Sequence, residues 1–124
     1  ILDKANIEAK AIYRDRMKTI IDKNIERADE IIANIRRYKE YKAILKEMAD
    51  LCVKMIGNDC IINVDNADKS LIAGANVKYG DVDQYGGVLG VSKSGDLELD
   101  LRISKIIDDL NEMMRTKLYS QLEG

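Results

Sequence analysis

The sequence contains no His, Pro, Trp or Phe and only two Cys among its 124 residues. The absence of histidine removes the commonest general acid–base side chain and one of the usual zinc ligands. A cysteine nucleophile would lack its usual base for the same reason. Cys52 and Cys60 do not make a disulfide framework, and we expect both to be reduced, as in a cytoplasmic protein. These absences disfavour an enzyme, and we expect no catalytic residue, no cofactor and no bound metal.

An excess of one charge and long apolar runs are missing as well. Lys and Arg number 20 against 22 Asp and Glu, which gives a net charge of −2. Nucleic acid is not an expected partner, because phosphate binding needs a basic excess. No apolar run approaches the roughly 18 residues of a membrane-spanning helix, so we expect no direct membrane insertion. The chain begins at Ile1 inside a charged helical pattern, and we expect further native sequence upstream.

The composition of the chain changes at Gly57. All eight glycines lie from Gly57 onward. Residues 1–56 carry 13 basic and 10 acidic side chains, a net charge of +3, which leaves 7 and 12, a net charge of −5, for the remainder. The composition therefore predicts a helical region followed by a region rich in turns.

Apolar residues recur at helical spacing in the first region. An offset of eleven residues aligns Ala9 with Ile20 and Ile31. Eleven residues in three turns favour a right-handed supercoil with a partner helix. The alternative is an amphipathic helix that packs on its own domain. The residues expected at the partner-helix interface are Ala9, Tyr13, Met17, Ile20, Ile21, Ala28, Ile31, Ile32 and Ile35.

Helix length bears on these two alternatives. A continuous helix over residues 1–56 would be about 84 Å long, whereas a compact domain of this size has a radius of gyration of about 14 Å. The helix must project or fold back, and a projecting apolar stripe would need a partner. The charged segment 36–41 predicts a break near residues 37–40. We expect a stalk helix over residues 1–37 and a globular domain over residues 38–124.

The region after Gly57 alternates between strands and turns. Gly57 itself is typical of a helix stop with positive φ. We expect a helical segment from Asn66 to Ala73, capped by Asn66, a hairpin around Gly95 and a last helix from Ile103. The predicted strands are Cys60–Val64, Asn76–Tyr79, Gly87–Ser92 and Leu97–Leu101.

The last of these strands has a clear alternation. Leu97, Leu99 and Leu101 alternate with acidic residues, which predicts one buried and one wet face. The expected fold class is α+β, with a long N-terminal coiled-coil-type helix followed by a small domain. In that domain we expect a four-stranded, mainly antiparallel sheet flanked by helices.

Two segments approach ligand-binding motifs without completing them. Gly87–Ser94 has the spacing of a phosphate loop, but Ser92 stands where a glycine is required and a strand follows in place of a helix. Asp81–Gly86 is similar to the start of a calcium loop, but Tyr85 cannot supply the fifth ligand. We interpret the first segment as a hairpin and the second as a solvated loop. The remaining candidate carboxylates are interpreted as turn, cap and outward strand positions: Asp65, Asp68, Asp96 and Asp100.

Three short motifs resemble the E subunit of the archaeal and vacuolar-type ATPases. They are Tyr85-Gly86-Gly87-Val88-Leu89 before the hairpin, Tyr41 followed by Ile44 and Leu45, and the ending Leu122-Glu123-Gly124. The resemblance covers essentially the whole chain and implies a C-terminal fragment of that family. Glu123 replaces the family's aromatic residue, and residues 101–106 keep little of its N-T-[LF]-E-x-R motif.

The resemblance implies a non-catalytic peripheral-stalk subunit, or stator, of a proton- or sodium-translocating rotary ATPase or ATP synthase. In this family the N-terminal helix pairs with a helical stalk subunit, and the C-terminal domain attaches to the non-catalytic B subunit of the head. The stalk links the head to the membrane part on the cytoplasmic face and resists rotation. Two alternatives stay open: a generic coiled-coil dimerisation or adaptor protein, and a small enzyme.

Overall fold

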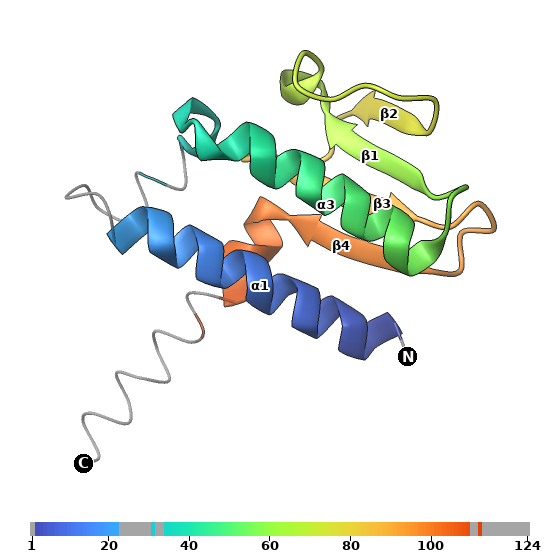
Figure 1. Ribbon diagram of the computed structural model, residues 1–124, viewed down its shortest axis with the longest axis horizontal. Coiled ribbons are helices and arrows are strands. Elements are labelled where there is room, and N and C mark those ends of the chain that lie inside the picture. The colour runs from blue at the N-terminus through green and yellow to red at the C-terminus, as the bar shows by residue number, and fades with distance from the viewer. Residues whose placement is uncertain (1, 23–30, 32–33, 110–111, 113–124) are drawn as a thin grey trace.

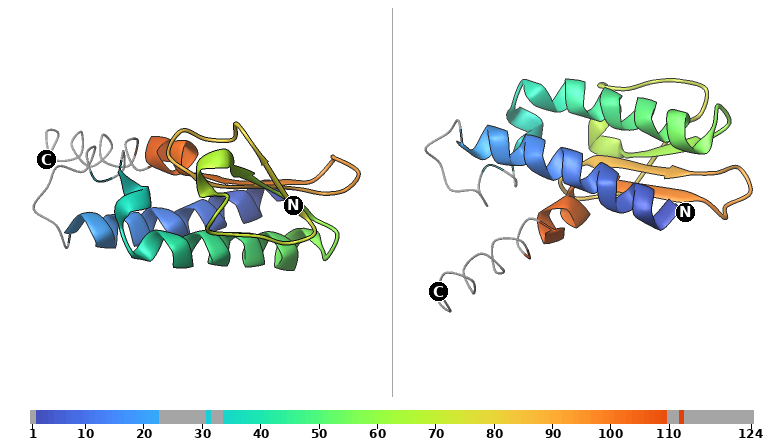
Figure 2. Two further views of the ribbon diagram at one scale, coloured as in Figure 1. Left: turned by 90° about the horizontal axis from the view of Figure 1, so that it is seen from above. Right: turned by 60° about the horizontal axis from the view of Figure 1, so that its bottom comes forward.

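The computed structural model describes residues 2–22, 31, 34–109 and 112. Two helices, α1 (Leu2–Asp22) and α3 (Glu40–Ile56), run in opposite directions side by side on one face of a sheet (Figures 1 and 2). A 3₁₀ turn, η1 (Ile35–Arg37), leads into α3 and confirms the predicted break. α3 ends at Gly57, whose φ is +134° and whose N–H donates to the carbonyl of Val53. The glycine therefore stops the helix as predicted.

Four strands form one sheet in the described part of the chain, in the order β2-β1-β3-β4. β1 is parallel to β2 and antiparallel to β3, and β3 is antiparallel to β4. The sheet is mixed, with two of its three pairings antiparallel, and the chain has an α+β fold. Each strand lies within one residue of its predicted bounds: β1 (Ile61–Asp65), β2 (Val77–Gly80), β3 (Gly87–Val91) and β4 (Glu98–Arg102).

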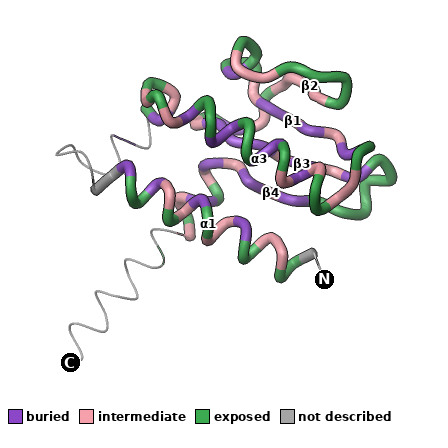
Figure 3. The backbone as a smooth tube through the Cα atoms, viewed as in Figure 1, coloured by how far each residue is buried: buried purple, intermediate pink, exposed green. Residues whose placement is uncertain are grey.

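The face of the sheet toward the helices supplies the core. Its register aligns Val77, Ile62, Gly90 and Leu99 in one row across the four strands. α3 packs mainly over β3 and β4, where a Cβ on Gly90 would lie only 2.6 Å from Sγ of Cys52. A side chain at this position would therefore force Cys52 of α3 to shift. Burial is concentrated where helices and sheet face one another (Figure 3).

The apolar stripe of α1 faces this same core. Ala9, Tyr13, Met17 and Ile20 are only 2–6% exposed, and α1 packs against β4. Ile31 and Ile35 are each 1% exposed and belong to the same cluster. The side chain of Ile21 and residues Ala28 and Ile32 lie outside the described residues. In this structure the chain itself covers the six described members of the stripe.

The long projecting helix expected from the sequence is not confirmed. α1 spans 21 residues, and the chain folds back so that α3 lies beside it (Figure 1). Folding back buries the stripe within one molecule and requires no partner. The division at residue 37 between stalk helix and globular domain stays a prediction. In this structure the described part of α1 shares one core with the strands and α3.

Two local expectations near the sheet were wrong. The helical segment after β1 is a single 3₁₀ turn, η2 (Asn66–Asp68), and its N-cap is Asp65, whose carboxylate accepts from the N–H of Ala67. Leu97 is 42% exposed, because it precedes β4 at the hairpin end of the sheet, while Leu99 and Leu101 are fully buried. Residues 103–109 are helical, and Ile103 and Ile106 enter the core as predicted.

Candidate functional site

A polar network joins η1, α3 and η2 to the loop before β3. Asp68 is fully buried; its Oδ1 accepts a hydrogen bond from Nε of Arg36 at 2.9 Å, and its Oδ2 accepts one from the hydroxyl of Tyr41 at 2.6 Å. The same hydroxyl accepts from the N–H of Gly87 at 3.1 Å. Arg36 also donates to the carbonyl of Gln84 at 2.8 Å. The network therefore fixes the loop before β3 against the three helical segments.

The network stabilises the charged form of Arg36 and the neutral form of Tyr41. Burial lowers the pKa of Arg36, but the hydrogen bond and the charge of Asp68 outweigh that effect and raise it overall. Burial and the bond to Asp68 also raise the pKa of Tyr41. A charged guanidinium and a neutral phenol that are already hydrogen-bonded suit a structural role. The expected turn position of Asp68 is confirmed, because it is the last residue of η2, but its complete burial was not expected. Its partners lie 32 and 27 residues away, beyond any local motif.

The loop that is similar to the start of a calcium motif is held by hydrogen bonds to the carboxylate of its own Asp83. Asp83 is 8% exposed, and its Oδ2 accepts from the N–H groups of Tyr85 and Gly86 at 3.0 and 3.1 Å. Its Oδ1 accepts from the hydroxyl of Ser104. The prediction of a solvated loop was wrong for this residue. Over residues 2–22, 31, 34–109 and 112, no three or more Cys, Asp or Glu side chains are grouped to hold a metal ion.

The other chemical candidates are also structural. The segment that approached a phosphate loop is β3 followed by the turn into β4, so the hairpin prediction is confirmed. Cys52 and Cys60 are free and buried. Burial, with a smaller contribution from the nearby Cys60, raises the pKa of Cys52 to about 12. A thiol that stays protonated near neutral pH is a poor nucleophile.

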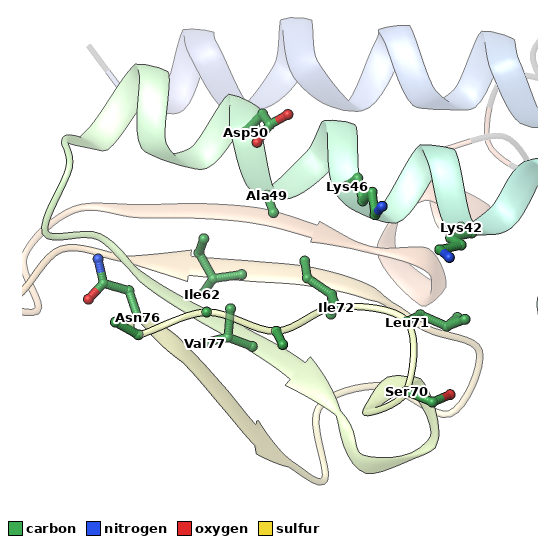
Figure 4. Close-up of a pocket in the computed structure, with 13 residues that line it drawn as sticks. Lys42, Lys46, Ala49, Asp50, Ile62, Ser70, Leu71, Ile72, Asn76 and Val77 are labelled. Atoms are coloured by element: carbon green, nitrogen blue, oxygen red, sulfur yellow. The ribbon is translucent and has the colours of Figure 1, made fainter.

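A surface groove lies between α3 and the segment that precedes β2 (Figure 4). Ile62 of β1 and Val77 of β2 line it from the sheet, and Leu71 and Ile72 line it from the preceding segment. Ala49 contributes the apolar part of α3. The volume of the groove is about 600 Å³, within the usual range of ligand-binding clefts. We call it the β1–β2 groove.

Charged side chains line only one side of the β1–β2 groove. Lys42, Lys46 and Asp50 follow one another at intervals of four residues along α3, and all three are exposed. The lysines extend from α3 toward the side on which Leu71 and Ile72 lie (Figure 4). With apolar walls and fixed charges, the groove suits binding better than covalent chemistry. Sequence reasoning missed it, because lysines spaced by four on a helix are ordinary surface residues.

Comparison with known proteins gives three related chains. The chain is 47% identical over 123 residues to a protein of Thermoplasma acidophilum and 42% identical over 123 residues to one of Thermoplasma volcanium, both named as the E subunit of an A-type ATP synthase. Each alignment covers 99% of this chain and 66% of the relative. A protein of Picrophilus torridus with the same name is 27% identical over 92 residues, 74% of this chain and 49% of that protein. No family model and no solved structure matches the chain significantly.

The chain belongs to the family of A-type ATP synthase E subunits. It spans 66% of the length of the two Thermoplasma members. Two of the motifs that carried the resemblance meet in the structure. Gly86 and Gly87 have φ values of +127° and +92°. A Cβ on Gly86 would overlap the hydroxyl of Tyr41, and one on Gly87 would overlap the carbonyl of Leu101. In this member of the E-subunit family, Tyr41 and the pair Gly86-Gly87 are thus in close contact.

Proposed function

We propose that the chain is part of a non-catalytic peripheral-stalk subunit, a stator, of a rotary A-type ATP synthase that translocates protons or sodium ions. There it helps to link the catalytic head to the membrane part and to resist rotation of the head. The observation that carries the proposal is the 47% identity over 123 residues to the Thermoplasma acidophilum protein that is named as the E subunit of an A-type ATP synthase.

The way α1 is fastened to the rest of the chain supports a mechanical role. At one end, Asn6 is hydrogen-bonded to Glu98 and Asp100 of β4. Further along, Arg16 forms an ion pair with Glu47 of α3. Between and beyond these points the apolar stripe is buried. A helix attached along its length transmits force to the sheet without hinging, which is what a stator requires.

The proposed partners are a helical stalk subunit and the non-catalytic B subunit of the head. The partner-helix interface through the buried stripe stays a prediction, and it would require α1 to leave its own core. Among the side chains of α1 that the structure describes, the large exposed apolar ones are Ile7, at 69%, and Ile12, at 54%. Ile7 and Ile12 are five positions apart, about 140° around the helix, so they do not lie on one side of α1. A stalk helix that contacts either residue would leave the core intact. We therefore propose that the helical partner binds an exposed side of α1.

The experiment is purification of the native complex through an affinity tag on the complete subunit. We expect the catalytic and B subunits of the head and a small helical subunit to co-purify, with ATP hydrolysis in the purified complex. Before detergent is added, the complex should sediment with membranes and expose the tag on their cytoplasmic face. No helix among the described residues is long and apolar enough to cross a membrane. Recovery of the tagged protein as a homodimer without head subunits would instead favour the adaptor alternative.

A further inference from the structure

The two free thiols approach the same point beside Gly90. Cys52 lies in α3, Cys60 directly precedes β1, and both are 0% exposed. A Cβ on Gly90 would lie 2.6 Å from Sγ of Cys52 and 3.5 Å from Sγ of Cys60. Because residue 90 is a glycine, no side chain of its own fills the space next to the two sulfurs. Two buried thiols from different elements are therefore neighbours.

The topology of the sheet explains why these thiols meet. Ile62 of β1 is paired with Gly90 of β3. Cys60 stands two positions before Ile62, so its side chain is on the same face of the sheet. α3 packs over β3 on that face and brings Cys52 to it. A disulfide needs two cysteines whose Cβ atoms face one another at close range, and the empty position at Gly90 gives both sulfurs room to turn.

Burial protects both thiols while the fold is closed. It raises the pKa of Cys52 and of Cys60, and the nearby Cys60 adds to the increase for Cys52. The backbone N–H groups of Gly90 and Val91 counteract part of this effect by hydrogen bonding to Cys52 and Cys60, respectively. Both thiols stay protonated near neutral pH, so a reagent in solution can reach a thiolate only where the fold opens.

The turn before β1 is the place where such an opening exposes a thiol. Asn58 and Asp59 are exposed. The N–H of Cys60 donates to the carbonyl of Gly57 at 3.1 Å, and the side-chain amide of Asn76 donates to the carbonyl of Asn58 at 2.8 Å. Short exposed segments of this kind open locally at a lower free-energy cost than the core. Opening here exposes Cys60 first and leaves Cys52 on its helix.

We infer that Cys52 and Cys60 are a reversible redox site that forms an intrachain disulfide by exchange with a low-molecular-weight disulfide. The bond would clamp the end of α3 to the start of β1, and a low-molecular-weight thiol would release it. This inference goes beyond the proposed function and does not depend on it.

The exchange proceeds in two balanced steps. In the first, the thiolate of Cys60 attacks one sulfur of the reagent, the sulfur–sulfur bond of the reagent breaks, and one thiol molecule leaves. In the second, Cys52 gives its proton to solvent and attacks the sulfur of Cys60, and the second thiol molecule leaves. Two electrons pass from the two protein thiols to the reagent, which is reduced to two thiols.

The test uses the complete protein that contains this chain, folded and exposed to millimolar oxidised glutathione. Trypsin then cleaves the protein without a reductant. Because Lys54 lies between the two cysteines, the digest separates them into peptides 47–54 and 55–69. We expect mass spectrometry to find these two peptides joined by a bond that dithiothreitol breaks. A wild-type protein in which both thiols stay free, or in which each carries its own glutathione, would overturn the inference.

Two single variants are the matched controls. Cys52→Ser should hold one glutathione on Cys60, because the second step has no attacking thiol. Cys60→Ser should keep Cys52 free, because Cys52 is not exposed when the turn opens. Thermal melting checks that both variants fold. Rapid release of glutathione from Cys60 in folded Cys52→Ser would overturn the inference, because the second step would then not need Cys52.

A second measurement shows whether the bond fits the native fold. We expect the oxidised protein to unfold cooperatively at a higher urea concentration than the reduced protein. The amides of residues 57–60 should exchange with solvent about tenfold more slowly, because the bond opposes local opening. Dithiothreitol should reverse both effects. An oxidised protein that has lost its cooperative transition would overturn the inference, because the bond would then belong to the unfolded chain.

Discussion

The side-chain amide of Asn6 in α1 mimics a neighbouring strand for Asp100 in β4. Its Oδ1 accepts a hydrogen bond from the N–H of Asp100 at 2.8 Å. Its Nδ2 donates to the carbonyl of Glu98 at 2.9 Å. An edge strand with unpaired backbone groups invites pairing with another chain. One helical residue thus covers this part of the sheet edge and fastens α1 to it.

Replacement of Asn6 by alanine should loosen this edge. We expect the loss of two side-chain to backbone hydrogen bonds to lower the free energy of unfolding by about 1–2 kcal/mol. The amide of Asp100 should exchange with solvent much faster in native-state hydrogen exchange. Glu8→Ala, an exposed position on the same helix, serves as the control and should change neither value. An Asp100 amide that stays fully protected in Asn6→Ala would contradict the role given to Asn6.

Replacement of Met17 by aspartate tests where the apolar stripe of α1 packs. Met17 is 2% exposed, and its substitution removes roughly 1.5–3 kcal/mol of burial and adds the cost of a desolvated carboxylate. We expect cooperative unfolding in urea to be lost or shifted to much lower denaturant. Ile12→Asp, at a position that is 54% exposed on the same helix, should fold normally. If Met17→Asp melts like the wild type but no longer binds a helical partner, the stripe is the partner interface that its spacing suggested.

Gly87→Ala compared with Gly95→Ala isolates one steric contact. Both glycines have positive φ, +92° and +83°, so both alanines carry a similar conformational cost of about 1–2 kcal/mol. A Cβ at position 87 would also overlap the carbonyl of Leu101, whereas position 95 has no atom within 4 Å. We expect Gly87→Ala to be at least 2 kcal/mol less stable than Gly95→Ala in urea denaturation, as for overpacked sites. Equal stability of the two variants would refute the close contact.

The buried thiol of Cys52 should make the fold less stable at alkaline pH. Its pKa rises from an ordinary 9.0 to about 12 in the folded chain, mainly through burial. Above pH 9 the unfolded thiol loses its proton and the folded one keeps it, so the unfolded state is favoured as pH rises. The free energy of unfolding should therefore fall by up to ~1.4 kcal/mol per pH unit from this group, between its unfolded and folded pKa values. Urea titrations from pH 8 to 10.5 should show a shallower decline for Cys52→Ala. Parallel declines would contradict the assignment.

The purified chain should neither hydrolyse nor tightly bind ATP. Its nearest approach to a phosphate loop is a β-hairpin, and Lys93 lies exposed in the turn. Calorimetric titration with ATP and Mg²⁺ should give no heat of binding at micromolar protein concentration. A micromolar dissociation constant that Lys93→Ala abolishes would refute the non-catalytic proposal for this chain.

The sequence by itself determined the local elements. Gly57, the alternation around Leu99 and the glycine turn at position 95 act within a few residues, where backbone sterics and side-chain period decide the outcome. Those signals placed all four strands within one residue and predicted the break before α3. The family resemblance also came from the sequence, through short motifs such as Gly86-Gly87.

Only the tertiary structure decided what the apolar stripe of α1 covers and where a binding surface remains. The same helical period is compatible with packing on a partner helix or on the chain's own sheet. In the structure Met17 and Tyr13 pack in the core with β4 and α3, so long-range contacts within the chain determine what the stripe covers. Asp68 gave no local sign of its burial, because its partners Arg36 and Tyr41 are brought to it by the fold. The β1–β2 groove has the same origin. It lies between α3 and the segment that precedes β2, and a sequence does not specify how far apart two such segments will lie until all of them pack together.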